Sequence, residues 1–165
     1  MQASLRIPNE VSESFAGQLL TELESAYQDV RSYIAELAQL LDQPQADRLR
    51  LTSVRLRLAQ LRLTHGAAVG HAYRILATNA DGAEQSEIKE MQLSHQRLLQ
   101  AAAAHTGKWT FDAVEADWAG YRQATRTIVR CWLAKMESER QLLYPLLERK
   151  AHLTQVSRLS VPLPN

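Results

Sequence analysis

Apolar residues recur every three or four positions along most of the chain, a spacing that lines one face of a helix. The pattern occupies four stretches, separated by segments that contain Pro44, Asn79 to Gly82, and Gly107. These stretches lie between 10 and 41, 51 and 75, 88 and 105, and 112 and 146. Short connections between amphipathic helices favour antiparallel neighbours. The pattern therefore predicts an all-α, up-down-up-down four-helix bundle.

The bundle is expected to occupy residues 10–152, between an N-terminal arm over 1–9 and an extended or disordered tail over 153–165. Pro145 should kink the last helix or end its regular part. Within the second stretch, residues 49–58 also alternate as a β-strand would. The length of the surrounding pattern and its content of Ala, Leu, Arg and Gln favour a helix there.

Polar residues stand at six positions where the helical pattern expects an apolar side chain. They are His65, His95, His105, Thr125, Lys135 and Glu139. A bundle buries such positions between facing helices, so each side chain needs a hydrogen-bonding partner. His105 lies near a helix end, where a histidine is typical of a cap or rim.

The heights of these residues can be compared by counting a rise of about 1.5 Å per residue between antiparallel neighbours. On this count His65 and His95 lie at nearly the same height, together with Glu22 of the first helix and with Tyr121 and Thr125 of the last. Two imidazoles and a carboxylate in one layer suit zinc, iron or manganese. The alternative is a hydrogen-bonded His–His or His–Tyr pair that only stabilises the core.

Two segments resemble a known family. Residues 133–147, LAKMESERQLLYPLL, resemble the last helix of hemerythrin-like (HHE cation-binding) domains, where a His, a Glu four residues later and an aromatic-Pro pair occur. Residues 91–99, MQLSHQRLL, resemble the helix that opens the second half of that family. The resemblance implies a bundle that holds a di-iron centre for oxygen binding, sensing or iron-linked redox handling. It assigns ligand positions to His95 and Glu139.

The ligand set implied by this resemblance is incomplete. Lys135 stands where the family has a His, and a protonated ammonium cannot ligate a metal. Neither His65 nor His71 is followed by a Glu four residues later, and the height count places Glu139 well beyond the His65/His95 layer. Two hypotheses follow. One is a metal-free degenerate member with an internal Lys135–Glu139 ion pair, and the other is a reduced site for iron, di-iron or mononuclear, or for zinc.

A second apolar face is expected on the second helix, roughly opposite its core-facing side. Leu49, Leu56 and Leu63 repeat every seven residues, and the face continues to Tyr73. Such a face predicts a partner, most simply a second copy of the chain in a twofold dimer. Burial under the arm or the tail is the alternative. The competing functional hypothesis is accordingly a cofactor-free interaction or regulatory bundle that acts through this face.

Composition narrows the classes of protein further. The chain has 165 residues, of which 45% are hydrophobic, which indicates one domain. The single cysteine, Cys131, excludes an intramolecular disulfide, predicts a cytoplasmic protein and is expected to be a buried small hydrophobe. A net charge of +1 and the lack of a membrane-length apolar run argue against nucleic acid and membrane partners. Without a phosphate loop or a nucleophile elbow, an enzyme is the least supported class.

Overall fold

The computed structural model describes the backbone of residues 10–78 and 80–159, and the side chains of residues 17–78 and 80–150. Within these ranges every regular element is an α-helix, and no strand occurs. The elements are α1 (Glu10–Leu41), α2 (Arg48–Ala77), α3 (Gly82–Lys108), α4 (Phe111–Ala116) and α5 (Trp118–Leu159). The all-α prediction is confirmed, and the ambiguous segment 49–58 is helical. None of the helices described is long and apolar enough to cross a bilayer.

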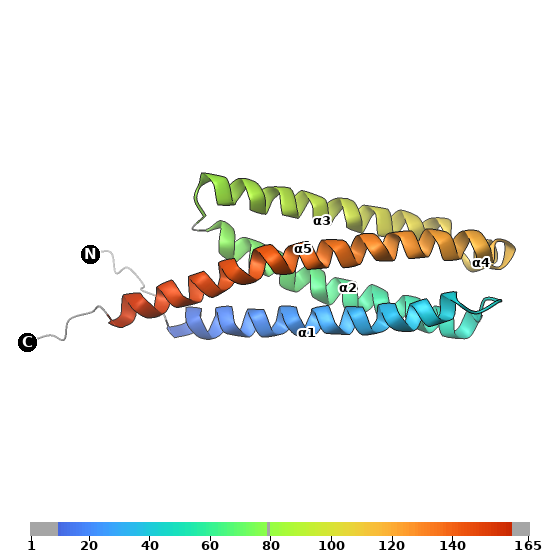
Figure 1. Cartoon of the computed structure of the whole chain (residues 1–165), viewed down its shortest axis with the longest axis horizontal. Coiled ribbons are helices and arrows are strands. Elements are labelled where there is room, and N and C mark those ends of the chain that lie inside the picture. The colour runs from blue at the N-terminus through green and yellow to red at the C-terminus, as the bar shows by residue number, and fades with distance from the viewer. Residues whose placement is uncertain (1–9, 79, 160–165) are drawn as a thin grey trace, which may run out of the picture.

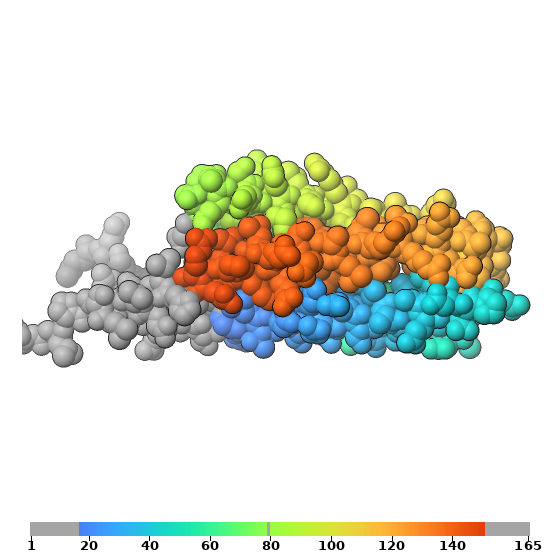
Figure 2. All heavy atoms as spheres, viewed as in Figure 1, coloured from blue at the N-terminus to red at the C-terminus, as the bar shows by residue number. Residues whose placement is uncertain are grey.

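The four long helices lie side by side, and the short α4 lies at one end of them (Figure 1). α1 packs against α2 and α5, while α3 packs against α5 and α2. Buried contacts give the directions of α1 and α2, because Leu41 shares a cluster with Leu51, whereas Leu19 shares one with Val69. These two helices are therefore antiparallel. Figure 2 shows α5 between α3 and α1 on one face of the molecule.

The predicted turns between the first three helices are confirmed, and aspartates cap the helices that follow them. Asp47 accepts a hydrogen bond from the backbone N–H of Arg50 at 3.0 Å. Asp81 accepts from the N–H groups of Ala83 and Glu84, both at 3.0 Å. Each carboxylate satisfies N–H groups that have no partner within the helix and complements the positive end of the helix dipole.

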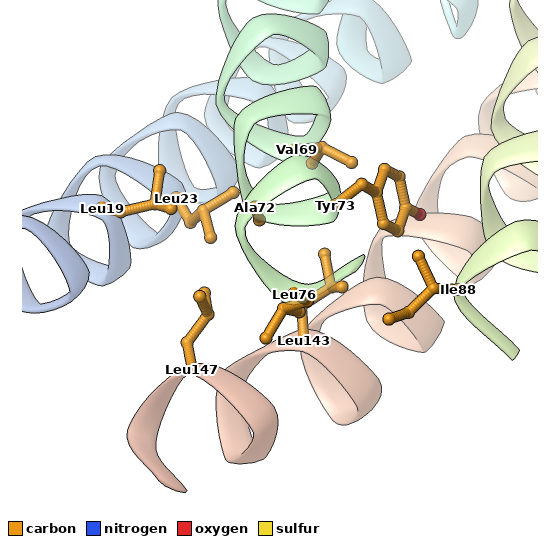
Figure 3. Close-up of a cluster of buried hydrophobic side chains, with 9 residues drawn as sticks. All are labelled: Leu19, Leu23, Val69, Ala72, Tyr73, Leu76, Ile88, Leu143 and Leu147. Carbon is orange, nitrogen blue, oxygen red and sulfur yellow. The ribbon is translucent and has the colours of Figure 1, made fainter. Parts of the chain in front are cut away.

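The apolar core receives side chains from all four long helices, which holds them in fixed register. Figure 3 shows one of three clusters of buried residues, in which leucines of α1 and α5 meet the last turns of α2. Its members are Leu19, Leu23, Val69, Ala72, Tyr73, Leu76, Ile88, Leu143 and Leu147. Full burial of one leucine or valine side chain contributes about 1.5–3 kcal/mol. Packing of these faces therefore supplies most of the stability of the helices.

The segment between α3 and α5 differs from the prediction of one helix that begins near Asp112. α4 begins at Phe111, after Thr110, whose hydroxyl accepts from the N–H of Ala113. It ends at Ala116, and the side chain of Asp117 then accepts from the N–H of Gly120 at the start of α5. This corner lengthens the connection before the chain runs back along α3.

The C-terminal part of α5 corrects two further predictions. Of the two effects predicted for Pro145, an end of the helix is wrong, because α5 continues to Leu159. Residues 153–159, expected to be extended or disordered, have a helical backbone, and residues 160–165 lie outside the described part of the chain. The arm predicted over 1–9 also lies outside it.

Candidate functional site

The structure buries the polar residues that the helical pattern placed on core positions. His65, His95, Thr125, Lys135 and Glu139 are between 2% and 7% exposed. The sixth of these residues, His105, is half-buried in the last turn of α3, as expected for a rim position. The prediction from periodicity is thus confirmed, and the partners of these side chains decide what they can do.

The carboxylate of Glu139 on α5 lies at the centre of the largest group. Its Oε1 accepts a hydrogen bond from Nδ1 of His95 on α3 at 2.9 Å. The same oxygen lies 3.1 Å from Nζ of Lys135, one helical turn earlier on α5. It also accepts from the phenol of Tyr73 on α2 at 3.3 Å. Three donors from three helices therefore converge on one carboxylate oxygen, which we call the Glu139 site.

Lys135 completes its hydrogen bonds entirely within this site. Besides Glu139, its ammonium donates to the Tyr73 phenol oxygen at 3.4 Å and to Sδ of Met91 at 3.5 Å. An ammonium has three hydrogens to donate. Each of them therefore has an acceptor, so the positive charge is held by protein groups in place of water.

The two histidines face each other across the site, as the height count predicted. Their ring centroids are 6.3 Å apart. Nε2 of His65 lies 3.7 Å from Oε2 of Glu139, which is too long for a hydrogen bond. Among the described residues, Nδ1 of His65, Nε2 of His95 and Oε2 of Glu139 are buried without a hydrogen-bond partner. These three buried atoms thus have no hydrogen-bond partner among the described residues, whereas Oε1 of Glu139 has three.

The electrostatics of the site favour one buried ion pair. Burial alone would raise the pKa of the Glu139 carboxyl, but the His95 hydrogen bond and the Lys135 charge outweigh burial and lower that pKa. Burial lowers the pKa of His65 more than the charge of Glu139 raises it. Burial, followed by the Glu139 charge, raises the pKa of Tyr73. At neutral pH the site therefore holds an ionised carboxylate, a neutral His65 and a protonated phenol.

These residues do not fit the di-iron centre that the family resemblance implies. In residues 17–78 and 80–150, no group of three or more His, Cys, Asp and Glu side chains is arranged to hold a metal ion. His65, His95 and Glu139 do lie together, but a lysine ammonium contacts the one carboxylate among them. An ammonium offers no lone pair to a metal and repels one by its charge.

The height count was wrong for the last helix. It placed Glu139 far from His95, yet the two are hydrogen-bonded, and it placed Thr125 in the histidine layer, yet the Thr125 hydroxyl lies 3.1 Å from Nε2 of His105. The reason is the α4 corner, which shifts the register of α5 along α3. Glu22, also predicted in the layer, is exposed on α1, in a surface groove that His71 shares.

The structure confirms part of the apolar face predicted on α2: its three leucines are exposed. Leu49, Leu56 and Leu63 are 84%, 61% and 74% exposed. Tyr73, predicted to continue this face, is buried and belongs to the Glu139 site. The position of Tyr73 in the sequence could have indicated this burial. Tyr73 follows His65 by eight residues, about two helical turns, and so returns to the same side of α2.

Cys131, which was expected to be buried, is exposed.

Comparison of the chain with protein-family models, with curated proteins and with solved structures finds no match. The hemerythrin-like resemblance therefore stays a prediction from residues 91–99 and 133–147.

Proposed function

We propose that this chain is a non-enzymatic, hemerythrin-like domain with an up-down-up-down four-helix arrangement, in which a lysine has taken the place of the metal. On this proposal the chain works as a binding or regulatory module and not through metal chemistry. The observation that carries the proposal is the Lys135 ammonium, 3.1 Å from the buried Glu139 carboxylate.

The exchange of a metal for an ammonium is chemically consistent. A buried carboxylate needs a nearby positive charge, because desolvation of an unpaired charge is costly. Lys135 precedes Glu139 by four residues, so both side chains project from the same face of α5. Lys135 therefore supplies that charge from the position where the family resemblance expects a His ligand.

The same geometry argues against acid–base catalysis at this site. A general base has to approach the proton that it removes to within hydrogen-bonding distance, directly or through a water. Glu139 is 2% exposed, and its Oε1 already accepts from three donors. A substrate would have to displace these donors, which supports a structural role for the carboxylate.

Iron loading of single variants tests the proposal. After anaerobic incubation with ferrous iron and desalting, we expect no stoichiometric iron in the natural chain. The Lys135→His variant removes the ammonium and adds an imidazole, so it should retain iron. Lys135→Met is the matched control, since it removes the charge without adding a ligand, and it should not retain iron. Elemental analysis and an absorption spectrum in air provide the measurement.

Retention of near-stoichiometric iron by the natural chain would overturn the proposal. It would favour a second candidate function, metal handling through a reduced site at His65, His95 and Glu139. The buried atoms without partners at these three residues favour that candidate. In that case replacement of both histidines by Ala should abolish the metal content, whereas under the metal-free proposal it should lower stability alone.

We also infer that the exposed leucines of α2 pair with a second copy of this chain. Leucines at a seven-residue spacing are typical of a helix that packs against another helix. Replacement of Leu56 by Glu should lower the solution mass from two chains to one, measured by light scattering. Leu99→Glu, a change at an exposed leucine of α3, is the control and should leave the mass unchanged. A natural chain with the mass of one copy would refute this inference.

A further inference from the structure

A cavity of about 120 Å³ lies among the four long helices, away from the Glu139 carboxylate. Aliphatic side chains form much of its wall, including Val30, Ile34 and Leu37 of α1 and Ile128 of α5. It is partly open to the outside. An engineered apolar cavity of about 150 Å³ takes up benzene, so this space suits a ligand of about one ring.

Two arginines of α2 line this apolar space. The Arg62 guanidinium lies 5.7 Å from the ring centroid of Trp132, and the Arg55 guanidinium lies 5.9 Å from that of Tyr121. Stacking on aromatic faces holds each cation at the cavity by cation–π attraction. These contacts therefore favour guanidinium positions at the wall of the cavity.

Neither cation has a counter-ion in the described side chains. None of the residues that line the cavity is acidic, and in residues 17–78 and 80–150 no carboxylate forms an ion pair with Arg55 or Arg62. Nη1 of Arg55 and Nε1 of Trp132 are buried without a hydrogen-bond partner there. Buried donors of this kind are rare in folded proteins, and a bound molecule is one explanation for them.

The positive charge acts on the neighbouring histidine. Burial, followed by the charges of Arg55, Arg62 and Lys108, lowers the pKa of His105. His105 is therefore neutral at pH 7, and its Nε2 shares a hydrogen bond with Thr125. The cavity thus contains two uncompensated positive charges beside a neutral imidazole and a hydroxyl.

We propose that this cavity binds a small apolar monocarboxylate, an acid of about the size of benzoate. A guanidinium presents parallel N–H donors that match the two oxygens of a carboxylate. The aliphatic and aromatic wall would enclose the apolar part of such a ligand. The proposal goes beyond the proposed function, because it concerns a different set of residues and is independent of whether the Glu139 site binds metal.

Calorimetric titration of the full chain with sodium benzoate tests the ligand class. Benzamide is the matched neutral probe, since it has the same ring and nearly the same shape. We expect benzoate to bind with a dissociation constant of about 1 mM or below, as small ligands with good contacts do. Benzamide should bind at least tenfold more weakly. Equal binding of the two probes, or no binding of benzoate, would overturn the proposal.

Variants of the cavity test the location. Arg55→Gln and Arg62→Gln should each weaken benzoate binding at least tenfold. Arg50→Gln removes the same charge from an exposed position of the same helix, so it should leave benzoate binding unchanged. A melting curve of each variant shows that it is folded. Unchanged affinity in both cavity variants would place any binding elsewhere and refute the assignment.

A filled cavity gives an independent test that does not alter charge. Ala59 lines the space, so Ala59→Leu should occupy part of it and abolish benzoate binding while the melting temperature stays the same or rises. Full benzoate affinity in this variant would show that the ligand does not enter the cavity.

Discussion

The Glu139 site and the Arg55/Arg62 cavity are two polar regions that lie between the same helices. They differ in whether their charges are compensated by neighbouring side chains. At the Glu139 site one ammonium and one carboxylate lie 3.1 Å apart, and the ammonium has three acceptors. At the cavity two guanidinium groups stack on aromatic rings, and no described carboxylate pairs with them.

The difference separates a structural role from a binding role. A charge pair whose hydrogen bonds are complete has little to gain from an added molecule, since that molecule would displace existing partners. Unpaired cations beside an apolar cavity gain both a counter-ion and buried contacts when an anion binds there. We therefore expect mutations at the Glu139 site to change mainly stability, and mutations at the cavity to change mainly ligand affinity.

The largest expected effect is that of Glu139→Gln. It leaves the buried Lys135 ammonium without a counter-charge, which typically destabilises a protein by about 3–5 kcal/mol. Urea denaturation at pH 7 measures the free energy of unfolding. The double variant Lys135→Met/Glu139→Leu is the control and should recover much of the loss, because it removes both charges together. A single variant within about 0.5 kcal/mol of the natural chain, the range of surface substitutions, would contradict the structural role.

Acid should destabilise the protein below neutral pH. Burial lowers the pKa of His65 from its ordinary 6.5, so below that pH the unfolded chain binds a proton that the folded chain resists. Stability supplied by neutral His65 is therefore present above pH 6.5 and is lost as the pH falls below it. The lowered pKa of His105 changes stability in the same direction. The lowered pKa of Glu139 adds a further loss of stability at more acidic pH.

The measurement is the urea midpoint at pH 7, 6 and 5, which we expect to fall with pH. The groups that face His65 are Glu139, His95 and Lys135, so His65→Gln tests the assignment by removing one titrating group from this set. The variant should show a shallower fall between pH 7 and 5. A midpoint that rises on acidification would contradict the neutral state of His65.

Thr125→Val should have an intermediate effect at the edge of the cavity. The change preserves the shape of the side chain but removes the partner of His105 Nε2 at 3.1 Å. Loss of one uncharged hydrogen bond is expected to lower the free energy of unfolding by about 1 kcal/mol. A loss as large as that of Glu139→Gln would show that the two regions do not differ as proposed.

Arg55→Met should have the smallest effect on the ligand-free protein. Arg55 has no carboxylate partner among the described side chains, so its removal leaves no charge unpaired. The expected loss is limited to its cation–π contacts, about 0.5–1 kcal/mol. Thermal denaturation without ligand provides the measurement. A much larger loss would assign Arg55 to the structural framework and not to a binding site.

The residue pattern was sufficient to predict the burial of polar residues at core positions, because these positions follow from helical periodicity, although it misplaced Tyr73 and Cys131. It placed His65, His95, Lys135 and Glu139 in the interior and identified the Lys135–Glu139 pair from their spacing of four on one helix. Such a spacing is local, and a helix fixes it without reference to the rest of the fold.

The contacts of α5 with the other helices could not be predicted in the same way, because they depend on where the connection before α5 reverses the chain. The α4 corner moved Glu139 next to His95 and moved Thr125 next to His105. A residue count that assumes a single turn between α3 and α5 does not allow for such a corner. The same limit hid the cavity that Arg55 and Arg62 line, because its wall comes from four helices.

The sequence by itself determined an all-α protein, the buried set of polar residues and the exposed leucines of α2, since these follow from the period of an α-helix. Tertiary structure alone decided that Tyr73, His95 and Lys135 meet on one oxygen of Glu139, and that two arginines line an apolar cavity. The physical reason is that contacts between helices depend on register and side-chain packing across the whole core, which no single helix encodes.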